Sequence, residues 1–393
     1  MFYRLIENLR CPDDGNFPMQ INVIKIKKLN QFKSKNIRSQ IPHCSLLCGR
    51  KMQFINNLKK LPECKECYSD YILEGYFTCN KCKRRYPIVK GIPNVLPSNL
   101  ANLKNSVINH KFITHKISPN EVISNEIKRE EMAHHNETAI DYDDWWVNHP
   151  RSQIFYKRAV KIWKNNLSES NKSIIDIGCG SGKCSILMAK YGYLIGLDIS
   201  LKMIEILQKK VFKNGFIVDC VVGDAENLPF YDNCAKSATF WGVAHHLPNR
   251  IIAYKSVKRV IEKGGNLLIS EPNIKRSYIP FAIGKIINFP YYIIRSFLNL
   301  IRSKKLEASK THITKNEVLL NLNIEKKILN DLGFDIIYSK TRWFFGIIPI
   351  LWLPKKILFL IYKLFMYFDI VIEKNILKEK GGELCIIANL INK

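Results

Sequence analysis

The residues best suited to chemistry form three short motifs in the second half of the chain. Segment 174–182 combines an apolar run with an aspartate and a glycine-rich turn, contributed by Asp176, Gly178, Cys179, Gly180 and Gly182. Glycines at such a turn let backbone N–H groups approach a ligand at the start of a helix. Asp198, followed by Ile199, and Asp224, followed by Ala225, come at the ends of the next two apolar runs. A carboxylate at the first of these places can accept both ribose hydroxyls, and one at the second is positioned for an adenine edge. The motifs together predict a nucleotide-cofactor site.

A parallel sheet would bring these motifs together. Short apolar runs predict strands at Ser173–Ile177, Tyr193–Leu197, Ile217–Val222, Lys236–Phe240 and Gly265–Ser270. Helical patterns lie between them at Lys183–Lys190, Lys202–Phe212 and Arg250–Ile261. Strands and helices that alternate at this spacing form an α/β fold, whose ligands bind at the carboxyl ends of the strands.

The chain continues with a helix and two further predicted strands. Thr314 stands three residues before Glu317, a capping-box spacing that predicts a helix from there to Leu332. Residues 334–339 predict a sixth strand, and residues 383–390 predict an antiparallel seventh.

The motifs between Lys172 and Asn273 resemble those of class I S-adenosylmethionine-dependent methyltransferases, in particular the subgroup that acts on small molecules and lipids. The resemblance implies a Rossmann-like, seven-stranded methyltransferase sheet. It also implies that Asp176 and Gly178–Gly182 hold the methionine moiety, that Asp198 holds the ribose, and that Asp224 with Ala225 holds the adenine. A dehydrogenase that binds NAD is the main rival, but no Tyr-x3-Lys or similar catalytic set is evident.

A histidine pair, His245 and His246, follows the fourth predicted strand. Methyl transfer needs mainly alignment, but a hydroxyl or acidic carbon acceptor also needs a base, and histidine titrates in the right range. The alternative is that the pair only hydrogen-bonds the loop. Trp241 is placed either for packing or for cofactor contact. The Asn/Asp-Pro-Pro-aromatic motif of RNA and DNA amino-methylases is absent from this position.

Seven of the twelve cysteines precede residue 100, and four form two CxxC pairs. The N-terminus lacks the features of a secretory signal, so we expect reduced thiols in the cytoplasm. The two pairs are eleven residues apart, a separation that a short hairpin can span, so the predicted ligands of one structural Zn²⁺ are Cys64, Cys67, Cys79 and Cys82. The residues Cys11, His43, Cys44 and Cys48 are either a second Cys3His site or unrelated thiols.

The residues around the second pair carry a further resemblance. The run from Cys82 through Tyr86-Pro87-Ile88 to Gly91-Ile92-Pro93, with Cys11-Pro12 upstream, resembles the small zinc-ribbon activator subunits of tRNA and release-factor methyltransferases. It implies a fused zinc-ribbon domain, so that no separate activator is needed. Asp14 stands where a second cysteine is usual.

We therefore expect a zinc-ribbon domain at 1–100, a helical connector at 101–170 and a methyltransferase domain at 171–393. Two apolar inserts, 274–310 and 343–373, interrupt the last domain. Lysines and prolines within the second insert favour a lid or an interfacial amphipathic helix over a membrane span. The alternatives are additional core and a dimer interface.

The chain of 393 residues has 61 Lys and Arg against 34 Asp and Glu, a net charge of +27. The excess is spread along the chain, so it points only weakly to nucleic acid. The main hypothesis is a methyltransferase for a small, apolar or lipid-like acceptor, with peripheral contact to the inner face of a membrane. The alternatives are an rRNA or tRNA base methyltransferase and a cofactor-binding module without activity.

Overall fold

A seven-stranded sheet forms the centre of the protein in a computed structural model, which describes every residue except 30–43, 59–63, 102–118, 144–147, 168, 302–315, 346–347, 349, 351–352, 374–378 and 392–393. The strands are β7 (Ser173–Ile177), β8 (Leu194–Asp198), β9 (Val218–Val222), β10 (Ala235–Trp241), β11 (Ile261–Pro272), β12 (Phe334–Arg342) and β13 (Glu383–Leu390). Their order is β12-β13-β11-β10-β7-β8-β9. Six strands run in the same direction, and β13 runs antiparallel to its neighbours β11 and β12. The predicted Rossmann-like, seven-stranded sheet of an α/β fold is confirmed.

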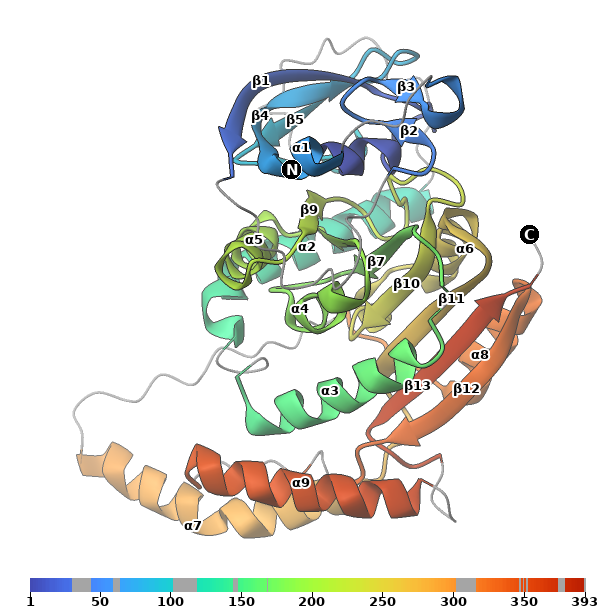
Figure 1. Ribbon diagram of the computed structural model, residues 1–393. Helices are drawn as coiled ribbons and strands as arrows, with labels where there is room; N and C mark the ends of the chain where they lie inside the picture. The colour runs from blue at the N-terminus through green and yellow to red at the C-terminus, as the bar shows by residue number, and fades with distance from the viewer. Residues whose placement is uncertain are drawn as a thin grey trace.

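Helices cover both faces of this sheet because its strands are apolar on both sides. Ile175 and Ile177 share a core with α6 (Arg250–Val260) and α8 (Leu322–Asp331). Ile174 faces the other way, into a core with α3 (Pro150–Lys164), α4 (Lys183–Met188) and α5 (Leu201–Asn214). The result is a three-layered α/β/α unit (Figure 1).

The predicted start of the helix before β12 is wrong. Thr314 lies outside the described residues, and Glu317 is in a loop. The helix α8 begins at Leu322, where the Asn321 side chain accepts hydrogen bonds from the backbone N–H groups of Asn323 and Ile324. An asparagine cap closer to the apolar run thus replaces the expected capping box.

A second, antiparallel sheet is built from the first hundred residues. Its strands are β1 (Gln20–Lys28), β4 (Asp70–Thr78), β5 (Arg85–Val89) and β6 (Ile92–Pro93), in that order. Around it lie the short elements η1 (Tyr3–Glu7), β2 (Leu47–Cys48), β3 (Gln53–Phe54), η2 (Ile55–Asn57) and α1 (Cys64–Ser69).

This N-terminal sheet packs directly onto the central one, at the top of the view in Figure 1. Asn94 forms a parallel bridge to Val222, and the N–H of Val95 donates to the Val222 carbonyl at 2.9 Å. The N–H of Phe2 donates to the buried carboxylate of Asp219 at 2.9 Å. Apolar residues of both units share one core. The N-terminal sheet therefore covers β9, which would otherwise be an exposed edge strand.

The predicted connector region contains α3 and the longer helix α2 (Pro119–Tyr142). The helix α2 packs against α5, and α3 packs against α9 (Lys355–Ile372). These helices do more than join two units, because both contribute side chains to the cavity described below.

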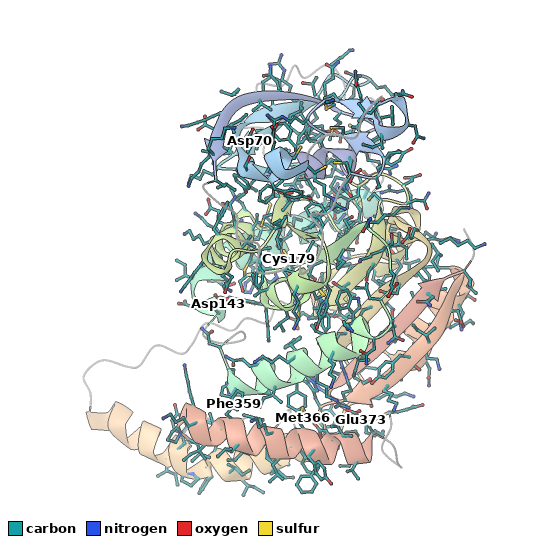
Figure 2. The ribbon with its side chains drawn as sticks, viewed as in Figure 1. Asp70, Asp143, Cys179, Phe359, Met366 and Glu373 are labelled. Carbon is teal, nitrogen blue, oxygen red and sulfur yellow. The ribbon has the colours of Figure 1, made fainter. Side chains whose placement is uncertain are left out.

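The two apolar inserts contain the helices α7 (Ile279–Ile301) and α9, which lie together at the end of the molecule opposite the N-terminal sheet (Figure 1). Leu358 and Tyr362 of α9 are buried in a small core that also includes Phe155 of α3 and contacts Ile283 of α7. Figure 2 shows Phe359 and Met366 along α9, with Glu373 at its end. Among the described residues, every helix falls short of what a bilayer crossing requires.

Candidate active site

One cavity of about 680 Å³ lies at the carboxyl ends of the parallel strands. It is lined by nearly all residues predicted to bind a cofactor or to act in catalysis: Asp176, Gly178, Cys179, Gly180, Asp198, Ile199, Asp224, Ala225, Trp241, His245 and His246. Gly182 is not among the lining residues. A Cβ on Gly182 would come within 2.2 Å of Leu207, so this glycine allows α4 to pack against α5.

The glycine-rich turn after β7 forms one wall of the cavity. Gly178 and Gly180 have positive φ angles of 63° and 52°. A Cβ on Gly178 would meet Val243 at 2.4 Å, whereas the space beside Gly180 is open to 3.8 Å. The backbone of this turn is therefore available to a ligand, as a bound cofactor would require.

Asp176, in β7 directly before this turn, stabilises the turn through its hydrogen bonds. Its carboxylate accepts hydrogen bonds from the hydroxyls of Ser185 and of Thr239, the latter at 2.9 Å. Burial raises the pKa of Asp176 to about 7, although these two bonds oppose the shift. The side chain thus ties β7 to β10 and α4 as well as reaching the cavity wall.

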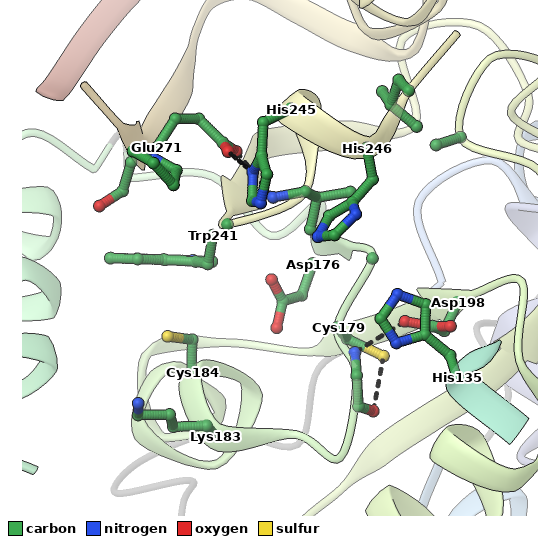
Figure 3. A pocket seen from close by; sticks show the side chains of 18 of the residues that line it. His135, Asp176, Cys179, Lys183, Cys184, Asp198, Trp241, His245, His246 and Glu271 are labelled. Carbon is green, nitrogen blue, oxygen red and sulfur yellow. Dashed lines mark hydrogen bonds and ion pairs between the residues drawn. The ribbon is translucent and has the colours of Figure 1, made fainter. Parts of the chain in front are cut away.

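Asp198 lies at the end of β8 (Figure 3), and backbone N–H groups fix both of its carboxylate oxygens. It accepts from the N–H of Gly180 at 2.8 Å and from the N–H of Ser200 at 2.9 Å. Burial raises the pKa of Asp198, and the neighbouring His135 opposes this shift. A carboxylate held in this way is oriented to accept hydrogen bonds from a diol.

Asp224, after β9, is engaged by a lysine that the sequence analysis did not single out. The Nζ of Lys128 lies 2.8 Å from Asp224 Oδ2 and 2.7 Å from Glu226 Oε2. All three side chains are buried, so the ion pairs are shielded from solvent. The pairing holds α2 against the loop after β9.

His245 forms a closely bonded pair with Glu271 of β11. Its Nδ1 lies 2.7 Å from Glu271 Oε2, and the other carboxylate oxygen accepts from the N–H groups of Val243 and Ala244 at 2.9 Å each. Glu271 is fully buried. In Figure 3 the imidazole lies between this carboxylate and the cavity. The arrangement fixes the ring orientation and leaves Nε2 for a substrate.

His246 contacts helix α2 instead. Its Nδ1 lies 3.2 Å from Glu131 Oε2, and the same oxygen lies 3.5 Å from His135 Nε2. Burial lowers the pKa of His246, and the adjacent His245 adds to the shift. The two rings of the predicted histidine pair stay together, with centres 4.0 Å apart, but His245 is bonded to Glu271 of β11 and His246 to Glu131 of α2.

The remaining wall of the cavity is formed by two basic side chains, Lys183 and Arg151, and by aromatic rings. The Nζ of Lys183 lies 3.5 Å from the centre of the Tyr156 ring, and burial lowers the pKa of Lys183 to about 7. Trp241 and Trp343 both line the cavity beside Tyr156, as does Arg151.

Several of these side chains were missed by the sequence analysis. Lys128, Glu131 and His135 lie at positions i, i+3 and i+7 of α2, so they share one helix face. This spacing was a usable signal in the predicted connector. Glu271 directly follows the fifth predicted strand, and a carboxylate before a proline at that place was a weaker signal.

The predicted metal-binding set of four cysteines requires correction. Cys64 and Cys67 lie on α1, directly before β4, whereas Cys79 and Cys82 lie in the turn between β4 and β5. The nine residues of β4 separate the pairs by about 30 Å of extended chain. The residues between the pairs form this strand instead of the expected short hairpin, so one ion cannot bind both pairs.

Cys79 and Cys82 instead meet Cys11 and Asp14, and the four ligand atoms lie within 4.8 Å of one another. The sulfur atoms of Cys11 and Cys82 are 3.7 Å apart. Thiolates that share a tetrahedral Zn²⁺ at its usual bond length lie about 3.8 Å apart. The donor set therefore fits Zn²⁺, with Asp14 in the position where a cysteine is usual.

Cys64 and Cys67 have a different set of neighbours. Cys48 of β2 interacts electrostatically with both, and the backbone N–H of Cys44 donates to the Cys64 sulfur. Cys48, Cys64 and Cys67 are buried. His43 lies outside the described residues. The Cys3His site considered for Cys11, His43, Cys44 and Cys48 is thus wrong, because Cys11 lies with the other pair.

Residues 175–269 match a family described as "Methyltransferase domain". This part of the chain, which runs from β7 into β11, is therefore similar to methyltransferase domains.

Curated relatives match part of the chain. The chain is 28% identical over 178 residues to the ubiquinone/menaquinone biosynthesis C-methyltransferase UbiE of Wigglesworthia glossinidia brevipalpis. This match covers 39% of this chain and 70% of the relative. The chain is 33% identical over 139 residues to the demethylmenaquinone methyltransferase of Thermotoga maritima, with 34% and 56% covered. The chain spans little more than half the length of that second relative.

Among solved structures, a S-adenosylmethionine-dependent methyltransferase of Thermotoga maritima is 17% identical, with 66% of this chain and 99% of that chain covered and a TM-score of 0.41.

Proposed function

We propose that this protein transfers a methyl group from S-adenosylmethionine to a small, lipid-like acceptor. The observation that carries the proposal is the single cavity in which the glycine-rich turn, Asp198 and Asp224 lie opposite the pair of His245 and Glu271. Its volume falls in the usual range for ligand pockets, which leaves room for a cofactor and part of an acceptor.

Each group then has a distinct role. The backbone at Gly178 and Gly180 receives the methionine moiety, Asp198 accepts the ribose hydroxyls, and Ile199 and Ala225 border the adenine. Lys128 orients Asp224 at the adenine edge. Bound S-adenosylmethionine supplies a methyl group on a sulfonium, a good leaving group.

His245 is the proposed general base. Its Nε2 would take the proton that the acceptor loses as the new bond to the methyl group forms, and Glu271 would stabilise the resulting imidazolium. The sulfonium loses its charge as the methyl leaves, so charge and atoms balance. Base catalysis of this kind contributes about 10²–10⁴-fold in rate.

The proposed acceptor is the ring carbon of a reduced quinone. The two relatives described above carry names that refer to quinone methylation, and the wall formed by Tyr156, Trp241 and Trp343 suits a flat ring. To test this, purified protein is incubated with S-adenosylmethionine and a demethylated naphthoquinol in detergent. Mass spectrometry should find one added methyl group on a ring carbon, and an unchanged quinol would count against this acceptor.

We further propose that α7 and α9 rest on an anionic membrane surface. Large apolar side chains are exposed along both helices, including Ile286 and Phe289 of α7 and Leu360 and Leu364 of α9. Lys285, Lys355, Lys356 and Lys363 are exposed on the same pair. The only carboxylate within either helix is Asp369, which is buried. Apolar contact and attraction to anionic headgroups would then act together.

Replacing Leu360 and Leu364 by Glu should therefore weaken binding to anionic vesicles more than tenfold, because burial of each leucine stabilises the bound state by about 1.5–3 kcal/mol. Sedimentation with vesicles containing phosphatidylglycerol measures this. The matched control replaces Ile24 and Ile26, also exposed but on β1 of the N-terminal sheet, by Glu. Equal binding by all three proteins would exclude the α7–α9 surface.

The N-terminal unit is proposed as a fused zinc-ribbon domain with two structural ions, which would make a separate activator unnecessary. One ion is held by Cys11, Asp14, Cys79 and Cys82, and the other by Cys44, Cys48, Cys64 and Cys67. Metal bound in this way stabilises a small unit with a limited core.

Freshly purified protein should therefore contain two zinc ions per chain. Cys79→Ser and Cys67→Ser should each lose one ion, because each removes a ligand from a different end of β4. Inductively coupled plasma mass spectrometry counts the ions. Cys234→Ser, which lies outside both groups, should keep two. One ion or none in the unmodified protein would contradict the two-site arrangement.

A further inference from the structure

A third group of metal-ligating side chains lies inside the cavity, away from the cysteines. Glu131 and His135 are one helical turn apart on α2, and His246 lies on η7 (Ala244–His246). Glu131 Oε2 lies 3.2 Å from His246 Nδ1 and 3.5 Å from His135 Nε2. The centres of the two imidazole rings are 5.5 Å apart. Figure 3 shows His135 and His246 approaching each other from separate elements.

We propose that Glu131, His135 and His246 bind a divalent transition-metal ion. The three ligand atoms lie within 4.8 Å of one another. Nitrogen and oxygen ligands at about 2.0–2.1 Å from a tetrahedral ion are separated by about 3.3 Å, close to the two measured separations. Two imidazoles and one carboxylate favour ions such as Zn²⁺, Fe²⁺ or Co²⁺ over Mg²⁺ and Ca²⁺, which prefer oxygen ligands alone.

The position of Glu131 supports an ion between these rings. Its side chain is buried, and a carboxylate is costly to bury unless opposite charge or hydrogen bonds compensate. The two imidazoles already lie within 3.5 Å of Glu131, and a cation bound between the three side chains would add a direct opposite charge.

A further carboxylate lies near His246, in a group separate from Glu131 and His135. Glu317, in the loop before α8, forms a second compact group with His245 and His246. All five side chains line the cavity. An ion held by Glu131, His135 and His246 would therefore face the cavity, between Asp198 and the pair of His245 and Glu317.

The role of the ion rests on the proposed function. A hydroxyl of a reduced quinone that binds the ion would give its proton to Nε2 of His245 more easily, because a divalent cation stabilises the oxyanion. The oxyanion raises the electron density of the neighbouring ring carbon, which then attacks the methyl group. The ion would thus activate the acceptor beside His245.

Cobalt binding tests the site itself. Protein that retains its structural zinc is titrated with Co²⁺ alone, and visible absorption follows the ion. We expect one equivalent with visible d–d bands and without the strong near-ultraviolet band of cobalt–thiolate bonds. Loss of a side chain that only orients a ligand commonly costs about 10–100-fold in metal affinity. Loss of a ligand itself should cost more, so Glu131→Gln and His135→Ala should each weaken binding at least about 100-fold.

His134→Ala is the matched control, because His134 is the neighbouring histidine on α2 but is not part of the group. It should bind Co²⁺ as the unmodified protein does. Absence of saturable binding, or equal binding by all variants, would overturn the proposal and leave the three side chains as a hydrogen-bonded cluster. Binding of Co²⁺ by a protein that methylates nothing would instead retire the proposed function and keep the site.

Discussion

Replacing Glu271 by Gln is expected to lower kcat about 10²–10⁴-fold while leaving the affinity for S-adenosylmethionine within a few-fold. The Gln carbonyl can still accept from the N–H groups of Val243 and Ala244, so the loop should keep its shape. Its amide would then donate to Nδ1 of His245, which places the ring proton on Nε2. The ring could no longer take a proton from the acceptor. Steady-state kinetics with a saturating cofactor measures the loss.

A positioning role can be separated from a purely structural one in the same experiment. His245→Asn should lose as much activity as Glu271→Gln, and the double variant should lose little more than either, because residues that act as one unit are not additive. Glu262→Gln, on the same strand but in an ion pair with Lys172, is the matched control and should keep its activity. Additive losses would contradict a His245–Glu271 unit.

Replacing Asp198 by Ala should weaken binding of S-adenosylhomocysteine about 30–100-fold. Two hydrogen bonds from the ribose to a buried carboxylate would be lost, and bonds to a charged group contribute about 1.5–3 kcal/mol each, part of which water recovers. The variant also frees the N–H groups of Gly180 and Ser200, so the glycine-rich turn loses its anchor. Isothermal titration calorimetry measures the dissociation constant.

The control for this variant is Asp335→Ala, an exposed aspartate on β12 far from the cavity lining. It should bind the cofactor product as the unmodified protein does. A thermal unfolding curve of Asp198→Ala shows whether the protein remains folded. Unchanged affinity in a folded Asp198→Ala protein would refute the placement of the ribose.

The central sheet was predictable because its signals are local. The strands β7 and β13 have the predicted bounds, and the other strands differ by a few residues. Parallel strands that are buried on both faces are continuous apolar runs, which stand out from the polar helices between them. The glycine-rich turn, Asp198 and Asp224 follow these runs directly, so their meeting at one edge was also predictable.

The partners of these residues depend on contacts between distant segments. The face of α2 that carries Lys128, Glu131 and His135 is polar, like that of a solvent-exposed helix, and only tertiary packing turns it towards the cavity. The cysteines show the same limit. Two CxxC pairs eleven residues apart suggested a hairpin, but β4 extends between them and Cys11 reaches one pair from far upstream.

The most direct test of the account is where the methyl group goes. The protein is incubated with S-adenosylmethionine labelled in the methyl group and a cell extract, which is then separated into lipid and RNA fractions. We expect the label in the lipid fraction, and we expect Glu271→Gln to reduce it at least 100-fold. Label confined to RNA would contradict a lipid-like acceptor, and no label in any fraction despite tight cofactor binding would contradict methyl transfer altogether.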